Sequence, residues 1–327
     1  MTLAKVKVAT VAVLVVAASV GVAIAAQPAT APSKTGTGAG SGQTTPGLTK
    51  DAIHAMCGRL EALNNLWASY SVESSYNPSR KEPADIGGDA VLVPKTGTER
   101  SERTFSRLGL RARWDIDWIL PEDADRTPFS NLRHNPIQKE IYSFTGDSQE
   151  QLSVTRNHGP GGMILDRAMF QPSVLEAALG IRPRRRNSYF SVDEISRMEA
   201  ENTQDGAITL TWRDDQGEVQ QWTVKPELGY AVTAVRSGNV WITAEDFEAV
   251  DGLMVPKSVV FQLRVREGEK TRLVEDTRLK VHQYKLNDPE NTESRYHITW
   301  PKGTDVRDMR LGINLVADEK GALIRNR

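Results

Sequence analysis

The 327-residue sequence predicts an α+β fold in which one long helix precedes an antiparallel β-sheet. Three observations support this prediction. Apolar residues recur at three- and four-residue intervals just after residue 49. Several short runs beyond residue 68 alternate between apolar and polar side chains. Turn signals, most of them with glycine, separate the later runs at intervals of roughly ten residues, which is typical of an antiparallel meander.

Residues 1–26 are predicted to be a membrane-targeting segment. Lys5 and Lys7 precede an uncharged run from Val8 to Ala26, which ends on small residues that signal peptidase accepts. The run is also long enough to cross roughly 30 Å of hydrocarbon, so a cleaved signal peptide and a retained single-pass anchor both remain open. Either places the rest of the chain in the periplasm or elsewhere outside the cytoplasm, and an uncleaved segment would anchor it in the inner membrane.

Residues 27–48 are predicted to be a flexible linker, because they are rich in Pro, Ala, Thr, Ser and Gly and carry almost no large apolar group. The β-rich domain is expected to span residues 49–327. Its first helix is predicted to start at Thr49, whose hydroxyl can cap it. One face of this helix is expected to dock on the sheet through five apolar residues: Ile53, Met56, Leu60, Leu63 and Trp67.

The remaining elements follow from alternation and turn chemistry. Strands are predicted at residues 70–74, 114–118, 208–212 and 259–265, with successive hairpins from about residue 206 to residue 284. Two short helices are expected at 172–180 and 191–199, the second capped by Ser191 with Glu194 three residues later. The polar segment 75–95 is expected to be a loop, and Gly159–Gly162 a hairpin turn.

Composition and motif spacing argue against most catalytic and nucleic-acid functions. The net charge of −1 provides no electrostatic footprint for nucleic acid. Cys57 is the single cysteine, so an internal disulfide is excluded. No two of the five histidines have metal-binding spacing, and the G-x-S-x-G elbow of hydrolases does not occur. We therefore predict a non-enzymatic protein without catalytic residues, metal or cofactor, and keep an uncharacterised hydrolase as a third alternative.

The densest charged feature is the run from Arg182 to Arg186. Guanidinium groups bind phosphate and carboxylate bidentately, so Arg184, Arg185 and Arg186 are candidate anion-binding residues. A solvated loop between the two short helices is the alternative interpretation.

Three motifs of the later chain stand out. Residues 222–230 read as a strand with Trp, a Pro-Glu-Leu-Gly turn and a returning strand that begins with Tyr. Residues 251–257 read Asp-Gly-Leu-Met-Val-Pro-Lys, and residues 296–308 include Pro301, Gly303, Thr304, Val306 and Asp308. These motifs resemble the hairpin, the entry to the next strand and the closing segment of LolA-like proteins, the periplasmic lipoprotein-carrier superfamily, in exported members of planctomycete type. Lys225 departs from the acidic or amide residue usual in the first motif. The resemblance covers residues 50–318.

The resemblance implies an incomplete antiparallel β-barrel wrapped around helices, a half-barrel whose concave face binds an apolar or acylated ligand, such as a lipid or lipoprotein. Core packing is the alternative role for the aromatic residues that would line this face: Trp114, Trp118, Trp212, Trp241 and Phe261. A second hypothesis is a protein-interaction module, similar to periplasmic regulators of envelope stress, whose partner would be an envelope membrane protein. The family motifs are structural and transfer no catalytic residue.

Overall fold

The computed structural model describes residues 46–77, 81–86, 89–94, 97–120, 137–156, 159–166, 174–182, 189–214, 217–267 and 270–326. The helices within these residues are α1 (Pro46–Ala62), α2 (Val174–Ala178) and α3 (Val192–Ser196), with the 3₁₀ turns η1 (Pro226–Leu228) and η2 (Glu293–Tyr296). The first strands are β1 (Asn65–Tyr76), β2 (Lys81–Ile86), β3 (Asp89–Pro94), β4 (Gly97–Leu108), β5 (Arg111–Ile119), β6 (Ile137–Phe144), β7 (Gln149–Thr155) and β8 (Gly159–Leu165). The later strands are β9 (Glu199–Asn202), β10 (Ile208–Arg213), β11 (Val219–Lys225), β12 (Ala231–Ser237), β13 (Val240–Val250), β14 (Leu253–Glu267), β15 (Lys270–Leu286), β16 (Asp305–Asp308), β17 (Ile313–Ala317) and β18 (Leu323–Arg325).

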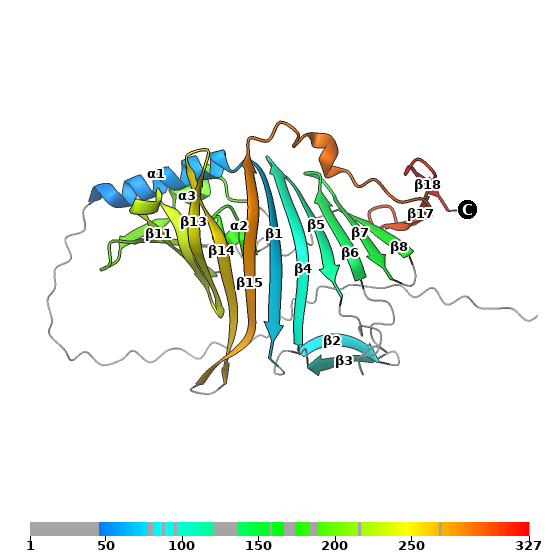
Figure 1. The fold of residues 1–327 in the computed structure, drawn as a ribbon, viewed down its shortest axis with the longest axis horizontal. Helices are drawn as coiled ribbons and strands as arrows, with labels where there is room; N and C mark the ends of the chain where they lie inside the picture. Colours follow the sequence, from blue (N-terminus) through cyan, green and yellow to red (C-terminus); the bar gives the residue numbers. More distant parts are fainter. Residues whose placement is uncertain are drawn as a thin grey trace, which may run out of the picture. The chain divides into compact units, whose positions relative to one another are not determined.

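The described strands form one 16-stranded open sheet and a separate β2–β3 hairpin (Figure 1). The order is β18-β17-β16-β8-β7-β6-β5-β4-β1-β15-β14-β13-β12-β11-β10-β9. Neighbouring strands are antiparallel except β8 and β16, which are parallel. The predicted α+β class is confirmed, and the succession from β10 to β15 is the predicted meander.

Three local predictions need correction or hold only in part. Helix α1 begins at Pro46, before the predicted cap at Thr49, and ends at Ala62, so Trp67 is not on the helix. Trp67 instead lies in β1, where it is paired with Ser106 and Lys285, because strand pairing on both sides overrides the helical spacing. Residues 75–95 are not simply a loop, since they include the end of β1 and the β2–β3 hairpin. The capping box that starts α3 is confirmed.

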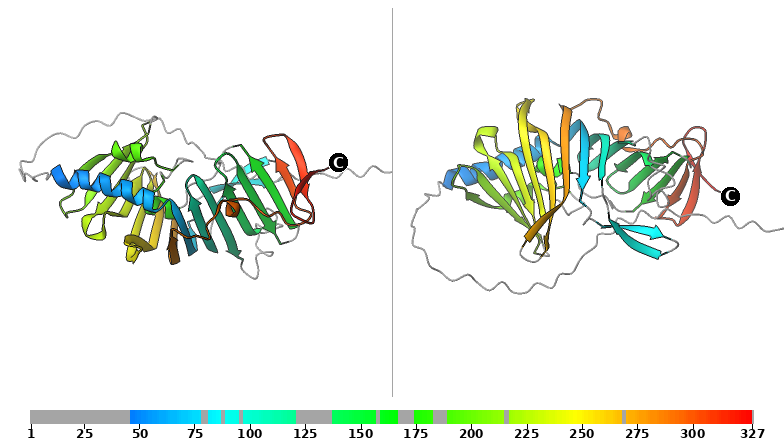
Figure 2. Two further views of the ribbon diagram at one scale, coloured as in Figure 1. Left: turned by 90° about the horizontal axis from the view of Figure 1, so that it is seen from above. Right: turned by 60° about the horizontal axis from the view of Figure 1, so that its bottom comes forward.

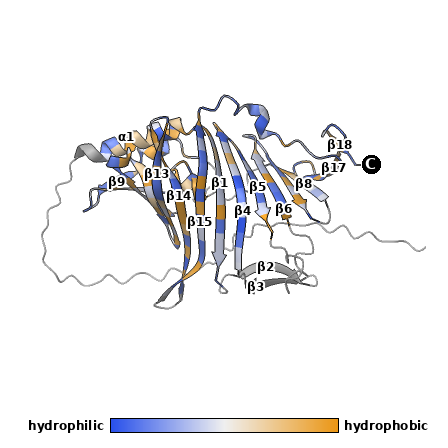
Figure 3. Cartoon of the chain, in the orientation of Figure 1, coloured by the Kyte–Doolittle hydropathy of each residue, from blue (hydrophilic) through white to orange (hydrophobic). Residues whose placement is uncertain are grey.

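The larger core lies between the helices and one face of the sheet, which we call the inner face. Helix α1 lies along the part of the sheet that ends in β9 (Figure 1, Figure 2). Side chains of α1 and α2 pack there against inward residues of β1, β4, β5 and β10–β15. Apolar and polar bands alternate along β15 and its neighbours (Figure 3). The largest fully buried side chains of this core are Trp222, Tyr70, Phe105, Phe261 and Met56.

A second, smaller core lies on the opposite, outer face of the sheet. Tyr142 and Ile141 are successive residues of β6, so their side chains point to opposite faces. Tyr142 packs against the larger core, whereas Ile141 belongs to the smaller one. The smaller core is completed by β7 and β8 and by residues that follow η2: Leu152, Ile164, Ile298, Trp300, Val306 and Ala317. One sheet is therefore covered on different faces in its two halves.

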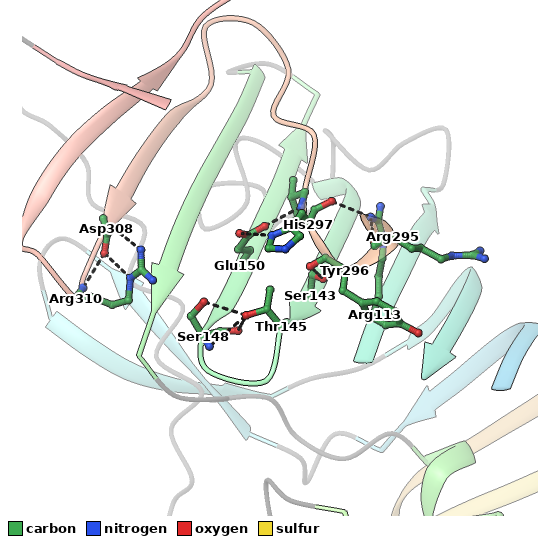
Figure 4. Close-up of polar contacts among 11 residues, drawn as sticks. Arg113, Ser143, Thr145, Ser148, Glu150, Arg295, Tyr296, His297, Asp308 and Arg310 are labelled. Atoms are coloured by element: carbon green, nitrogen blue, oxygen red, sulfur yellow. Dashed lines mark hydrogen bonds and ion pairs between the residues drawn. The ribbon is translucent and has the colours of Figure 1, made fainter. Parts of the chain in front are cut away.

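Hydrogen bonds of three side chains pin the chain around η2, residues 293–300, to the outer face (Figure 4). Ser143 Oγ donates to the carbonyl of Tyr296 at 2.6 Å. Arg113 Nη1 donates to the carbonyl of Arg295 at 2.8 Å. Glu150 Oε2 accepts from the backbone N–H of Ile298 at 2.7 Å. These bonds satisfy backbone groups that would otherwise be unpaired where the segment crosses the sheet.

Gly162 permits the closest contact of the second core. The prediction of a hairpin turn at Gly159–Gly162 was wrong, because β8 already begins at Gly159. A Cβ atom on Gly162 would lie 2.2 Å from Trp300 Cζ3, whereas a Cβ on Gly161 would meet nothing within 4 Å. Trp300 therefore occupies the space that any side chain at position 162 would need.

Replacing Gly162 by Ala should destabilise the protein by about 1–3 kcal/mol, because overpacking displaces the indole of Trp300. Urea unfolding measures this free energy. Gly161→Ala is the matched control in the same strand and should have a much smaller effect. Equal losses for the two variants would contradict the assigned packing.

Strands β14 and β15 separate at one end, and side chains close the gap. Their pairing stops at Ser258 and Lys280, beyond which β14 pairs with β13 and β15 pairs with β1. The opened edge of β14 presents two carbonyls. Arg59 Nη2 donates to Met254 O at 3.0 Å, and Tyr284 Oη donates to Pro256 O at 2.7 Å. Both donors are buried, and burial lowers the pKa of Arg59 to about 10.

Tyr284→Phe should lower the free energy of unfolding by about 1–3 kcal/mol near neutral pH, because the buried Pro256 carbonyl loses its donor. Burial raises the pKa of Tyr284 in the folded protein. The folded phenol thus stays protonated where the unfolded phenol, with a pKa of about 10, releases its proton. The advantage of wild type over Tyr284→Phe is complete below about pH 10 and shrinks above it. Urea unfolding across this range measures the difference, and a constant difference would contradict it.

Candidate functional site

A hollow of about 360 Å³ opens where the C-terminal end of α1, the β4–β5 turn and the start of α3 meet. We call it the rim pocket. Its volume lies within the range of small-molecule sites, about 300–1,000 Å³. Its lining residues come from three separate parts of the chain: Leu60, Glu61, Asn64, Arg107, Gly109, Leu110, Phe190, Ser191 and Val192.

Local backbone chemistry holds these three parts together. The N–H of Gly109 donates to the carbonyl of Asn64 at 2.9 Å, and Gly109 has a φ of +61°, a conformation that favours glycine. Ser191 caps α3: Glu194 N–H donates to Ser191 Oγ, and Ser191 N–H donates to Glu194 Oε2. Cys57 Sγ lies 3.9 Å from the carbonyl of Val192, which brings α1 and α3 together.

Four apolar side chains form one part of the rim pocket wall, and polar or charged residues, Glu61, Asn64, Arg107 and Ser191, form the rest. Leu110 is 68% exposed and Val192 is 41% exposed, whereas Leu60 and Phe190 are buried beneath them. The ring of Phe190 meets Trp222 and Trp212 edge-on, with centroid distances of 5.1 and 5.6 Å. Phe190 therefore connects the apolar part of the pocket wall with the core side chains of β10 and β11.

Arg107 adds a buried positive charge to this pocket. Its Nε donates to Gly109 O at 3.1 Å and its Nη1 to Leu63 O at 3.4 Å. The guanidinium lies 4.1 Å from the centroid of the Tyr189 ring. Burial lowers the pKa of Arg107, although Tyr189 and Glu176 favour its charged form. A cation held by carbonyls and a ring face can attract an anionic group.

A buried ion pair lies near Arg107. Glu176 on α2 accepts from Arg182 Nη1 at 3.4 Å, and both side chains are almost fully buried. The guanidinium of Arg182 also lies 5.5 Å from the Tyr189 centroid. The solvated-loop interpretation is therefore wrong for Arg182, because its side chain is buried and paired with Glu176 of α2. Arg184, Arg185 and Arg186 lie outside the described residues.

The five predicted aromatic residues do not share one surface. Trp114 and Phe261 are buried in the larger core, and Trp212 packs against that core beside Phe190. Trp118 lies on the inner face of β5 and donates from Nε1 to Glu140 at 2.9 Å. Trp241 lies on the outer face, opposite in direction to Phe261. Trp212 is thus the predicted residue that contacts the lining of the rim pocket.

Sequence reasoning missed most of the pocket residues. Leu60 was placed correctly on the docking face of α1, but Leu110 and Arg107 were not singled out. Two signals were available for them. A leucine directly after the turn glycine Gly109 is an apolar residue at a solvent-exposed position. Alternation with Phe105 places Arg107 on the inner face of β4.

Two findings concern metals and membranes. Within the stretches that the structure describes, no cluster of three or more His, Cys, Asp or Glu side chains could hold a metal ion. No helix in the same stretches is both long and apolar enough to cross a bilayer. The predicted segment 1–26 lies outside the described residues.

Comparisons with known proteins found likenesses only among solved structures. No protein-family model matches the chain, and no curated protein does. A DUF1329 family protein from Desulfovibrio piger is 11% identical with a TM-score of 0.41, covering 77% of this chain and 98% of its own. A LolA superfamily protein from Nitrosomonas europaea is 9% identical with a TM-score of 0.42, covering 75% and 97%. The LolA-like resemblance rests on the sequence motifs at residues 222–230, 251–257 and 296–308.

Arg182→Leu should cost about 3–5 kcal/mol of unfolding free energy, because it leaves the Glu176 carboxylate buried without this partner. The double variant with Glu176→Leu should lose less than the sum of the two single losses. Urea unfolding of the four proteins completes this double-mutant cycle. Strictly additive losses would show that the two side chains do not interact.

Proposed function

We propose that this chain is a non-enzymatic protein of the cell envelope that binds an apolar or acylated ligand, such as a lipid or lipoprotein, at the rim pocket. The observation that carries the proposal is the apolar wall of Leu110, Val192 and Phe190 beside the buried cation Arg107. An amphiphile complements both features, because its apolar chain suits the apolar wall and its polar or anionic head suits the cation. The LolA-like sequence motifs support this ligand class.

Packing of the inner face supports the rim as the place of binding. The space under α1 and α2 is occupied by core side chains, among them the fully buried Trp222, Tyr70 and Phe261. A ligand under the helices would have to displace this core, whereas the rim pocket is already open to solvent. The acyl chain would therefore enter between Leu110 and Val192 and end against Phe190.

The energetics of such binding come from apolar burial and from the two charged side chains of the lining, Arg107 and Glu61. Each methylene that leaves water contributes about 0.8 kcal/mol. The part of a chain that the rim pocket holds thus provides several kcal/mol before the ordering of ligand and side chains is subtracted. Arg107 then favours an anionic head group over a neutral one. No group in this arrangement has to form or break a bond.

Leu110→Asp should weaken binding of a dansyl-labelled fatty acid at least about tenfold, equivalent to about 1.4 kcal/mol, because it places a carboxylate at the entrance for the acyl chain. Fluorescence titration of the full-length protein measures the dissociation constant. Leu311→Asp is the matched control, since Leu311 is 66% exposed in a distant turn and Leu110 is 68% exposed.

Residues 1–26 are the same in wild type, Leu110→Asp and Leu311→Asp. Any binding of the fatty acid by that segment is therefore equal in the three proteins. The proposal predicts a wild-type constant for Leu311→Asp. If Leu110→Asp and Leu311→Asp bind the fatty acid equally well, the rim pocket is not the ligand site. If wild type itself does not bind, the ligand class is wrong.

A further inference from the structure

An exposed tryptophan stands between two arginines on the outer face of the sheet. Trp241 on β13 is 39% exposed. The guanidinium groups of Arg236 on β12 and Arg264 on β14 lie 4.7 and 4.9 Å from its ring centroid. Leu273 on β15 is opposite Arg264 in the register and is also exposed. The two guanidinium groups contact the indole, part of which remains exposed to solvent.

Positive charges dominate the outer face of β12–β15. Strand registers place Trp241 in one row with Gln262 and Asp276, and the neighbouring rows follow by alternation. The charged side chains that point outward with Trp241 are the cations Arg236, Arg264, Arg266, Arg278, Lys280 and Lys285 and the acids Glu245 and Asp276. Lys257 and Asp246 line a hollow on the same side, so the described cations of this face outnumber its acids by seven to three.

A hollow of about 630 Å³ lies on the outer side of β1, β4 and β15, two strands from Trp241. Lys280 lines it between Ser71 of β1 and Ser258 of β14 in the register. Arg278 and Arg100, which also line it, are paired with Asp276 and Glu73. Among the described residues Lys280 forms no ion pair, so its ammonium group is available to an external anion.

A chain of polar contacts connects Trp241 with the hollow. Arg264 Nη2 donates to Gln262 Oε1 at 2.7 Å, and Gln262 Nε2 donates to Asp276 Oδ1 at 3.2 Å. Arg278 Nε donates to Asp276 Oδ2 at 3.3 Å. These bonds fix long side chains before any partner arrives, which lowers the entropic cost of docking.

We propose that the outer face of β12–β15 docks on an anionic phospholipid surface. Trp241 and Leu273 would lie at the head-group level, where indole rings are favoured, and Arg236, Arg264 and Lys280 would face lipid phosphates. The cations are distributed over three strands, β12, β14 and β15, of one sheet. Such an arrangement matches a plane of phosphates, whereas an acidic peptide would contact one row of them.

Flotation of the full-length protein with vesicles tests this proposal. Vesicles of phosphatidylcholine alone are compared with vesicles that also contain phosphatidylglycerol. Wild type should bind the anionic vesicles more tightly, and the variant Arg236→Gln/Arg264→Gln/Lys280→Gln should lose at least about tenfold of this preference. The charge-matched control Lys50→Gln/Lys320→Gln/Arg325→Gln removes three exposed cations elsewhere and should keep it.

Quenching by brominated phosphatidylglycerol provides a second readout. The tryptophan fluorescence of wild type should be quenched on vesicle binding, and Trp241→Phe should lose most of the quenched signal. Residues 1–26, including Lys5 and Lys7, are the same in all variants. Equal preference in the two triple variants, or quenching that persists in Trp241→Phe, would overturn the proposal. The proposal would also be overturned if the variant Arg236→Gln/Arg264→Gln/Lys280→Gln lost binding to an acidic protein but kept its preference for anionic vesicles.

Discussion

The strict alternation of side chains across one continuous sheet is the constraint on which the other features depend. In β6, Ile141 and Tyr142 serve two different cores, because neighbouring residues point to opposite faces. A shift of one residue in the register of this strand would exchange the two cores and place each side chain on the wrong face. The helices and the segment around η2 can cover opposite faces only because this register is fixed.

Covering the sheet on different faces in its two halves also divides the surface available for binding. Helices α1 and α2 fill the inner face toward β9, so binding there is restricted to the rim where α1, α3 and the β4–β5 turn meet. The segment around η2 covers the outer face of β6–β8, whereas Trp241 and Leu273 on the outer face of β12–β15 are exposed. Two surfaces therefore remain for binding: the rim pocket, and the basic outer face of β12–β15.

Local signals predicted the elements well, and contacts between distant residues escaped prediction. The cap at Ser191 and the meander of β10–β15 depend on neighbouring residues, so the sequence contains them directly. The end of α1 depends on the pairing of β1 with both β4 and β15, which helical spacing at Trp67 does not reveal. The second core needs Gly162 and Trp300 together. Trp212 contacts the lining residue Phe190 without lining the pocket itself, and Arg107 and Val192 come from chain segments whose meeting is set by tertiary packing.

The cations of the two faces differ in how they are solvated, and this separates their roles. Arg59 and Arg107 are buried on the inner side and already donate to backbone carbonyls, so they stabilise the cover over the larger core and respond only to an anion that reaches them. Arg236 and Lys280 are exposed on the outer side, where salt screens them and where a second charged surface can meet them without displacing the core. Ligand capture at the rim and docking through the outer face therefore depend on different residues, and the failure of one leaves the other physically possible.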